Sequence, residues 1–491
     1  MIIPIALLTF FAAFVGAAVV TNPFSRLTIV KQPFIVEAFA GSLRAINNNH
    51  KLHVAQAWWW RLFATLKIFV HILETRYVKS PRSSATTIDG IIKDIHEQRF
   101  DPGKLLLTSG DHWSTLFSRN LGVFYYPMCD PRIPSNEQDW HNRQVVYLQT
   151  LAYALGVFEK RPIPVTTIVT TGRYRATCMN YWRYPSDTVY GLLFALAALL
   201  GKQDAAPGAY TAAKQQLETV PAAQLLFNEY RNTITQLYDH YRATVLDDAA
   251  CLLKRDLALC GAKDVTRRYG AFYDNVVFWK TTQLAMKLGI TENDPAFLQR
   301  LKRSILKTYW LEDEGYFLED LSEIGVREAH YSSDWLIVLI TGFLNPTKPN
   351  EQAYFTRSVD YIQRAGVDKP FALKYQAEAG GRHQFFLPKI AFASYQRDAI
   401  WSFWGMEYIK TLLLLHTSTH EAKYLRTADK HIEAYEKVML RDGGFPELYD
   451  HRGKFFETPF VRSIRLTGWV IGFEQVRAMR AAARARRGSV K

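Results

Sequence analysis

The sequence predicts an all-α fold, in which about a dozen helices form an (α/α)6 toroid of helical hairpins behind an N-terminal membrane helix. Apolar residues recur at intervals of three and four residues in ten separate segments. No stretch contains several short strands at regular spacing. Between the helices lie long loops dense in Gly, Pro, aromatic and charged residues, and loops of such length are usually functional. We therefore expect a ring of helices with elaborated loops at one end.

The amino terminus predicts the membrane helix. Residues 1–20 carry no charge, and about 20 apolar residues are enough to span a bilayer as a helix. A cleaved signal peptide would begin with Lys or Arg, and this segment has neither. The first charged residue is Arg26, followed by Lys31. The excess of positive charge after the span places the rest of the chain on the cytoplasmic side, anchored by a single span.

A second aromatic segment, 54–78, predicts an amphipathic helix. It contains three consecutive tryptophans, Trp58, Trp59 and Trp60, and titratable residues at roughly helical spacing, so it is not a membrane span. Two interpretations remain open. The tryptophans lie at a lipid interface, or the helix packs on the folded domain.

The ring itself is predicted from the periodic segments. They are 141–158, 187–200, 222–247, 273–288, 297–309, 333–344, 354–364, 397–416, 421–438 and 466–482. The longest loops are 127–140, 162–185 and 370–388. No low-complexity linker or short repeat divides the chain. We predict a membrane helix at 1–22, a helical N-terminal segment at 23–104, the barrel at 105–480 and a basic tail at 481–491.

Composition excludes several classes of protein. With 48% hydrophobic residues the chain is not disordered, and four cysteines without CxxC spacing predict neither a disulfide scaffold nor a zinc site. The net charge of +14 comes partly from six basic residues in 477–491, which we interpret as a frayed, solvated helix end. No nucleic-acid motif is present, so we expect no nucleic-acid partner. The 13 histidines show no metal-binding spacing, and no phosphate loop or GxSxG motif occurs, so we expect no metal or cofactor.

Six loop segments combine carboxylates, arginines and aromatic residues. They are 109–120, 184–190, 263–275, 331–335, 395–401 and 442–450. Aromatic faces beside carboxylates suit a sugar, because its C–H faces stack on rings and its hydroxyls bond to polar groups. Cleavage of a glycosidic bond also needs two carboxyl groups, one to protonate the leaving oxygen and one to activate water or attack carbon.

The carboxylates of these segments differ in their local context. Asp187 and Asp334 each precede a helix, so each is either a helix cap or a sugar ligand. Arg397 and Asp398 form either an ion pair at a helix start or part of a binding site. Glu447 follows two glycines and a proline, in a turn where the backbone rather than packing would hold it. We interpret Glu447 as a functional carboxylate.

These segments resemble, in the same order, the motifs of (α/α)6-barrel glycoside hydrolases, over residues 105–479. The most similar patterns are those of trehalases, processing α-glucosidase I and the glucosidase domain of glycogen debranching enzymes. The general-acid motif D-x-x-x-R is matched by 264–268, and the following helix ends at an LG pair, here Leu288 and Gly289. A GY-hydrophobic-D segment follows at 315–320. The segment 395–401 resembles Y-W-R-G-P-I-W in Arg397, Ile400 and Trp401.

The resemblance implies two catalytic residues. Asp264 would be the general acid, and Glu447 would be the base in a PE turn before the closing helix, whose W segment starts at Trp469. The pattern departs at Lys263, whose charge would lower the pKa of a neighbouring acid, while a general acid needs a raised pKa. Asp274 is therefore the second candidate acid. The Trp-rich motifs of trehalase itself are missing, so trehalose is not the first expected substrate.

What the resemblance implies is a membrane-anchored glycoside hydrolase that cleaves an α-glucosidic bond with inversion and needs no cofactor. Its partner would be an oligosaccharide or glucoside, and its oligomeric state stays open. The expected sugar-binding residues are Trp113, Arg119, Asp187, Arg268, Tyr273, Asp274, Asp334, Trp335, Arg397, Trp401 and Trp469. Two alternatives remain: a glycoside phosphorylase, and a catalytically inactive carbohydrate-binding or scaffold protein on the same barrel.

Overall fold

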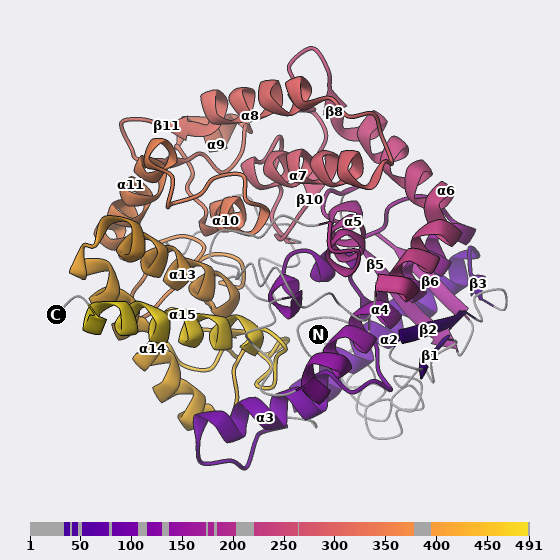
Figure 1. The fold of residues 1–491 in the computed structure, drawn as a ribbon, viewed down its shortest axis with the longest axis horizontal. Helices are drawn as coiled ribbons and strands as arrows, with labels where there is room; N and C mark the ends of the chain where they lie inside the picture. Colours follow the sequence, from indigo (N-terminus) through magenta and orange to yellow (C-terminus); the bar gives the residue numbers. More distant parts are fainter. Residues whose placement is uncertain are drawn as a thin grey trace, which may run out of the picture.

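The helices of the chain form a closed ring with an inner and an outer layer (Figure 1). The computed structural model describes residues 34–39, 42–47, 52–77, 81–106, 115–129, 137–172, 175–180, 184–202, 220–263, 265–377 and 394–489. Each of the ten periodic segments of the sequence forms a helix at its predicted place. The chain is an (α/α)6 toroid of helical hairpins, as predicted.

The chain alternates between the two layers. The outer helices are α3 (Ile88–Arg99), α4 (Glu137–Lys160), α6 (Val220–Val245), α8 (Pro295–Tyr309), α11 (Pro349–Ala365) and α14 (Ala422–Asp442). The inner helices are α5 (Thr188–Leu199), α7 (Phe272–Leu288), α10 (Ile337–Thr341) after the 3-10 turn η5 (Ser333–Leu336), α13 (Ser402–Thr419) and α15 (Val470–Ser489). All twelve residues of α5 are buried, whereas α8 buries one stripe. The burial pattern follows the layer in which a helix lies.

The sixth inner position is filled by two short 3-10 turns instead of a long helix. The turn η3 (Ser118–Leu121) packs against α5, and η4 (Tyr126–Cys129) packs against α15. The Tyr126 hydroxyl donates to Glu407 Oε2 at 2.9 Å and accepts from Lys410 Nζ at 2.7 Å. Lys410 and Glu407 form a buried ion pair at 2.7 Å on α13. These bonds fix the short segment to the inner layer.

Helix ends follow local sequence signals. At α8 the Asp294 carboxylate accepts the N–H of Phe297 at 2.8 Å, and Pro295 opens the helix. At α7 the helix ends at Leu288, and Gly289 adopts a left-handed φ of +69°. A residue with a Cβ would be strained in that conformation, so glycine ends the helix there.

Two β-sheets cover one side of the ring (Figure 1), where the sequence predicted loops and, over residues 23–104, a helical segment. Strands β5 (Thr167–Gly172) and β6 (Arg175–Met179) form an antiparallel hairpin inside the expected 162–185 loop. With β3 (His53–Val54) and β4 (Thr115–Leu116) they make a sheet in the order β3-β6-β5-β4. β-Branched residues in β5 favour a strand, and this outweighs the loop-like composition around it.

A second hairpin precedes this sheet in the chain. Strands β1 (Phe34–Phe39) and β2 (Ser42–Asn47) pair antiparallel, with Phe34 opposite Asn47. The hairpin packs against α4 and α6. This cover explains why α4, although an outer helix, is buried along most of its length.

The predicted amphipathic helix is α2 (Trp58–Tyr77), which packs on β5 and β6. The structure therefore supports packing on the folded domain. No helix in the described part of the chain is long and apolar enough to cross a membrane. Although α2 has 20 residues, it contains charged side chains at Arg61, Lys67, Glu74 and Arg76. We therefore correct the prediction of a membrane-anchored protein with its main domain on the cytoplasmic side. The segment 1–22, on which the anchor was placed, lies outside the described residues.

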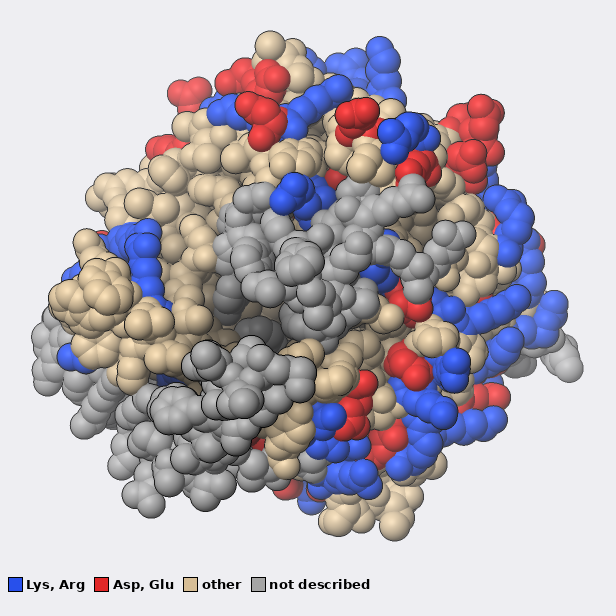
Figure 2. Space-filling model, turned by 180° about the vertical axis from the view of Figure 1, so that it is seen from behind, with Lys and Arg blue, Asp and Glu red and all other residues tan. Residues whose placement is uncertain are grey.

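The ring closes where α3 meets the last helices of the chain. Arg477 Nη1 lies 2.6 Å from Asp89 Oδ1, and Arg99 Nε donates to the carbonyl of Leu466 at 2.6 Å. The ring thus includes α3, which lies before the predicted barrel start at residue 105. Acidic and basic side chains intermingle on the surface seen from behind (Figure 2).

The basic end of the chain continues α15 as a helix. Arg480 lies 3.6 Å from Glu436, and Arg484 lies 2.9 Å from Asp429, both on α14. The acidic residues of α14 therefore partly neutralise the basic residues of α15. Residues 480–484, which the sequence predicted to be a frayed helix end, form ion pairs with α14.

Candidate active site

The candidate residues gather at the amino-terminal ends of the inner helices. Because each inner helix is followed by an outer helix that runs back, the inner helices run parallel and begin on one face of the ring. Most of these residues lie at or just before a helix start: Arg119 in η3, Asp187 before α5, Arg268, Tyr273 and Asp274 at α7, Asp334 and Trp335 in η5, Arg397 and Trp401 before α13, and Trp469 before α15. Glu447 lies in the loop between α14 and α15 and is bonded to the start of α13. Loops far apart in sequence thus reach a common face.

Arg268 is the centre of a buried ion-pair network. Its Nη1 lies 2.6 Å from Asp334 Oδ2 and 3.9 Å from Glu319 Oε1. Glu319 Oε1 also lies 2.6 Å from Lys263 Nζ, and all four side chains are buried. The carboxylates raise the pKa of Arg268 against the effect of burial, which lowers it. Asp334 acts here as an ion-pair partner, and the cap position of its turn belongs to Ser332.

Lys263 differs from what the sequence suggested. Its positive charge was expected to bear on the neighbouring Asp264. In the structure its Nζ is paired with Glu319 and lies 4.6 Å from the centre of the Tyr375 ring. The charge of Lys263 is therefore balanced within the buried network.

Asp187 occupies the cap position of α5, but its side chain makes no capping hydrogen bond. It accepts a hydrogen bond from the Tyr273 hydroxyl at 3.1 Å and lies 3.9 Å from Arg119 Nη1. The same Nη1 donates to the carbonyl of Gly261 at 2.8 Å. Asp187 therefore joins the starts of α5 and α7 instead of capping α5.

Asp274 is completely buried in the first turn of α7. Ser186 Oγ donates to its Oδ1 at 2.5 Å. Burial raises the pKa of Asp274, and nearby Asp334 adds to this rise, while Arg268 and the Ser186 hydrogen bond oppose it.

Gly261 allows the loop before α7 to approach this carboxyl group. A Cβ at this position would lie 2.5 Å from Asp274 Oδ1 and 2.6 Å from the Tyr273 ring. Such contacts are too short for any side chain to be accepted without movement of the loop. The absence of a side chain at residue 261 therefore sets the distance between the loop and α7.

Two glutamines connect the network to the segment before α13. Gln376 Nε2 donates to Glu319 Oε2 at 3.0 Å, and Arg397 Nη2 lies 3.4 Å from Gln376 Oε1. Gln396 Oε1 accepts from the backbone N–H of Val265 at 3.0 Å. Arg397 thus bonds across to another loop, in contrast to a local ion pair with its neighbour.

Backbone bonds hold Glu447 beside the start of α13. Its N–H donates to the carbonyl of Ile464, and its own carbonyl accepts the N–H of Ser402, both at 3.0 Å. Directly after it, β14 (Leu448–Tyr449) pairs with β13 (Ile400–Trp401), with Trp401 opposite Leu448. The side chain is 5% exposed. Glu447 is therefore fixed next to Trp401 by main-chain contacts.

The candidate tryptophans pack among other aromatic rings. Trp401 Nε1 donates to the carbonyl of Tyr395 at 2.6 Å, and the two rings meet edge to face at 4.9 Å. Trp469 stacks on Phe124 at 5.0 Å. Trp335 lies between Phe317 and Phe355 and is 1% exposed. The rings of Trp401 and Trp469 lie 5.8 Å apart, whereas Trp335 belongs to a separate aromatic group.

Two predicted residues, Trp113 and Asp264, lie outside the described residues. The role of Asp264 as the general acid therefore stays a prediction. Within the described ranges, no group of three or more His, Cys, Asp or Glu side chains could hold a metal ion. The sequence reasoning missed the structural roles of Glu319, Gln376 and Gln396. Glu319 and Gln396 had a signal, because they lie in the 315–320 and 395–401 segments, whereas Gln376 lies only in the long 370–388 loop.

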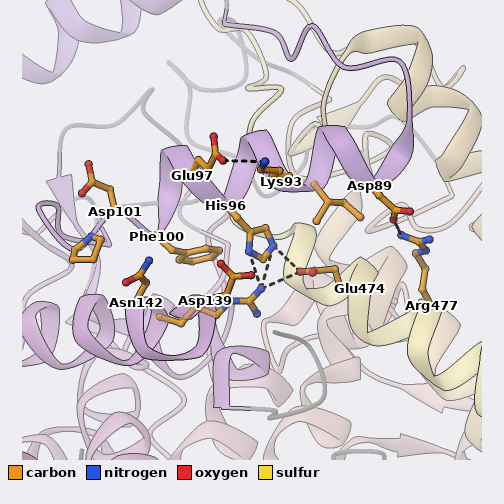
Figure 3. Close-up of a pocket in the computed structure, with 13 residues that line it drawn as sticks. Asp89, Lys93, His96, Glu97, Phe100, Asp101, Asp139, Asn142, Glu474 and Arg477 are labelled. Carbon is orange, nitrogen blue, oxygen red and sulfur yellow. Dashed lines mark hydrogen bonds and ion pairs between the residues drawn. The ribbon is translucent and has the colours of Figure 1, made fainter. Parts of the chain in front are cut away.

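A separate cavity of about 720 Å³ lies between α3, α4 and α15, and no candidate site residue lines it (Figure 3). Arg143 Nη2 donates to His96 Nδ1 at 2.7 Å, so Nδ1 is an acceptor and the imidazole proton sits on Nε2. His96 Nε2 in turn donates to Glu474 Oε2 at 2.8 Å. Burial lowers the pKa of Arg143, against the charges of Glu474 and Asp139. The three side chains link all three helices.

Among known proteins, only solved structures are similar to this chain. No protein-family model and no curated protein matches the chain. A rhamnosidase from Klebsiella oxytoca with rhamnose bound is similar at a TM-score of 0.47 and 12% identity, over 80% of this chain and 64% of the rhamnosidase chain. D-mannose isomerase gives a TM-score of 0.44 and 12% identity, over 82% and 98% of the two chains.

A third structure is the GH63 mannosylglycerate hydrolase from Thermus thermophilus in complex with Tris. Its TM-score is 0.42 at 11% identity, over 79% of this chain and 100% of that chain. The present chain therefore spans less than two thirds of the rhamnosidase and nearly all of the other two proteins.

Proposed function

We propose that the chain is a glycoside hydrolase that cleaves an α-glucosidic bond with inversion. The observation that carries the proposal is the cluster of carboxyl groups, arginines and aromatic rings at the common face where the inner helices begin. A buried carboxylate, Glu447, is held beside the start of α13 by main-chain hydrogen bonds. A carboxyl group with a raised pKa is present at Asp274. Both features match the needs of a glycosidase.

Glu447 serves as the general base. Its backbone is bonded on both sides, so the carboxylate keeps its place while the attacking water loses a proton. The PE turn that contains it resembles the base motif of debranching enzymes and glucosidase I. In an inverting reaction this base lies on the face of the sugar opposite to the acid.

Asp264 serves as the general acid, with Asp274 as the second candidate. The motif resemblance assigns the role to Asp264. The objection from Lys263 weakens, because that charge is paired with Glu319 at 2.6 Å. Asp274 has the raised pKa that an acid needs, but it is completely buried behind Ser186. For inversion, the acid and base carboxyl groups should be roughly 6.5–9.5 Å apart.

The buried ion pairs of the site position the sugar-binding side chains. Arg268 and Asp334, held at 2.6 Å, and Asp187, held by Tyr273, offer fixed acceptors and donors for sugar hydroxyls. Arg397, which is joined to the same network through Gln376, adds a forked donor. Fixed polar groups of this kind bind without losing side-chain entropy.

The deciding experiment is a screen of the purified full chain against α-linked glucose disaccharides, with the product anomer followed by NMR. Inverting hydrolysis releases β-glucose first, and Glu447→Gln abolishes the release. Release of α-glucose first contradicts inversion. Turnover only with inorganic phosphate identifies a phosphorylase. Sugar binding without turnover identifies an inactive carbohydrate-binding protein.

A further inference from the structure

The cavity between α3, α4 and α15 lies apart from the candidate active site, and we call it the closure cavity (Figure 3). Its volume of about 720 Å³ is within the range of pockets that hold small molecules. Asp101 and Asn142 lie at one end, and Glu474 and Arg477 lie at the other (Figure 3). The cavity is therefore elongated, with polar side chains at both ends.

Arg143 is a buried group of this cavity whose hydrogen bonding is incomplete. It lines the cavity and is 1% exposed. Its bonds to His96 and its ion pair with Glu474 all come from one nitrogen, Nη2. Within the described part of the chain, Nε and Nη1 are buried and have no hydrogen-bond partner. Buried donors are normally satisfied, so these N–H groups indicate an acceptor from outside the chain.

Carboxylates outnumber cations in the lining of the closure cavity by five to three. The carboxylates are Asp89, Glu97, Asp101, Asp139 and Glu474. The cations are Lys93, Arg143 and Arg477. Arg477 lies 2.6 Å from Asp89, and Lys93 lies 3.8 Å from Glu97. The lining thus combines paired charges with an excess of acceptors.

These charges disfavour an ionic ligand. An anion would accept from Arg143 but would lie among the carboxylates, of which Glu474 and Asp139 are near enough to oppose the lowering of the Arg143 pKa by burial. A cation would suit the carboxylates, but it cannot accept a hydrogen bond and would face the charge of Arg143. A neutral hydroxyl both donates and accepts. A ligand rich in hydroxyls therefore fits the buried donors and the carboxylates together.

The rest of the lining suits the carbon skeleton of such a ligand. Ile92, Phe100 and Pro102 line the same cavity and offer apolar carbon. Asn142 adds an amide, which can donate and accept. Polar side chains beside apolar carbon bind a sugar ring through its hydroxyls and its C–H faces.

We propose that the closure cavity is a second sugar site, which binds a neutral oligosaccharide outside the candidate active site. Arg143 donates to ring or hydroxyl oxygens of the sugar, and Asp139 accepts from its hydroxyls. This inference goes beyond the proposed hydrolase function, because no residue of the candidate active site lines the cavity. Oligosaccharide bound here contacts α3, α4 and α15 at once and stabilises the closure of the ring.

Hydrogen exchange followed by mass spectrometry locates the site. The probes are neutral trisaccharides, namely maltotriose, cellotriose and mannotriose, with spermidine as a cation and citrate as an anion. Glu447→Gln in the full chain prevents consumption of the sugar. At least one trisaccharide should slow exchange severalfold in peptides covering 88–101 and 139–143, and neither spermidine nor citrate should do so.

Asn142→Trp tests the cavity itself, because an indole at this half-buried position takes up the space for a ligand. It should abolish the protection of 88–101 and weaken calorimetric binding at this site at least tenfold. Asn228→Trp, on the exposed side of α6, is the matched control and should change neither. Each asparagine accepts a hydrogen bond from a glutamine four residues earlier at 2.8 Å, so both variants lose the same local bond.

If the helical signal shows that Asn142→Trp disturbs folding, Asp139→Asn replaces it, with Asp239→Asn on α6 as its control. Protection of 88–101 by a trisaccharide, lost in the cavity variant and kept in the control, supports the proposal. The same result without protection at the starts of α5 and α7 supports it while counting against the proposed hydrolase. Protection only at those helix starts would overturn the second site and leave the hydrolase intact. Protection of 88–101 by spermidine or citrate alone, or by none of the probes, would also overturn it.

Discussion

At the scale of single residues, the candidate site depends on long-range partners. Asp187 contacts Tyr273, which is 86 residues away, and Asp334 contacts Arg268, which is 66 residues away. Local sequence suggested capping for both aspartates, because each precedes a helix. In the structure neither aspartate makes a capping hydrogen bond, and each instead bonds to a distant side chain. The residue types of the site could be predicted from sequence, whereas their pairing could not, because pairing depends on which inner helices are neighbours.

The two candidate acids can be separated by substitution. Asp264→Asn should lower kcat by roughly 10²–10⁴, the typical contribution of a general acid. Asp274→Asn should leave most activity, because its surroundings already favour a neutral group. Steady-state rates on an α-glucoside with a poor leaving group give the comparison, and circular dichroism checks the fold. A larger loss in Asp274→Asn than in Asp264→Asn would reverse the assignment.

Arg397→Ala should weaken sugar binding more than folding. Its guanidinium reaches Gln376 only at the long distance of 3.4 Å, so loss of this bond should cost less than about 1 kcal/mol of unfolding free energy. Loss of a forked donor should weaken sugar affinity by about tenfold, which corresponds to about 1.4 kcal/mol. Calorimetric titration and thermal unfolding measure the two effects. Arg303→Ala, on the outer helix α8, is the control and should change neither. A large fall in Tm with unchanged affinity would make Arg397 a structural residue.

At the scale of elements, periodicity predicted the helices well and the strands poorly. The ten predicted helices exist because their apolar residues face a layer of the ring on a 3.6-residue period. The β5–β6 hairpin was missed because Gly and Pro around it resemble a loop. The strand residues Thr167 to Thr171 are β-branched, and this was the signal that pointed to a strand.

Lys67 gives α2 a measurable dependence on pH. Burial lowers the pKa of Lys67 from 10.5 to about 8. Between these pH values the unfolded chain binds a proton that the folded chain has released, so this group makes stability rise with pH. Relative to Lys67→Met, the unfolding free energy of the natural chain should rise by roughly 3 kcal/mol from about pH 7 to 10.5, at about 1.36 kcal/mol per pKa unit.

Urea unfolding at several pH values measures this difference. Lys93→Met is the control, because Lys93 is exposed on α3, and it should show no such rise. A difference between natural chain and Lys67→Met that does not change with pH would show that Lys67 is solvated, and that α2 does not pack on β5 as described.

At the scale of the whole molecule, the network of Arg143, His96 and Glu474 joins three helices where the ring closes. Glu474→Leu should destabilise the fold by about 3–5 kcal/mol, because it leaves the buried Arg143 charge without its carboxylate. Glu474→Gln should cost less, since its amide oxygen still accepts from His96. Glu433→Gln, on α14, is the control. If Glu474→Leu lowered the unfolding free energy no more than the control does, other contacts would stabilise the closure of the ring between α3 and α15.

The toroid as a whole could be predicted, but not its closing element. Helix α3 precedes the segment that resembles the barrel motifs, and no motif marks it as part of the ring. Its membership follows from contacts with α14 and α15, which sequence periodicity does not report. The membrane anchor was predicted on residues 1–22, which lie outside the described residues, and no helix of the described part of the chain could span a membrane.

Closure between α3 and α15 has a consequence for synthesis on the ribosome. His96 and Glu474 are 378 residues apart in the chain. At about 5–20 residues per second, α3 leaves the ribosome roughly 20–80 s before its partner exists. During that interval the side of α3 that later meets α14 and α15 lacks its partners. Nascent chains of this protein should therefore depend on chaperone binding near α3 until the last helix emerges.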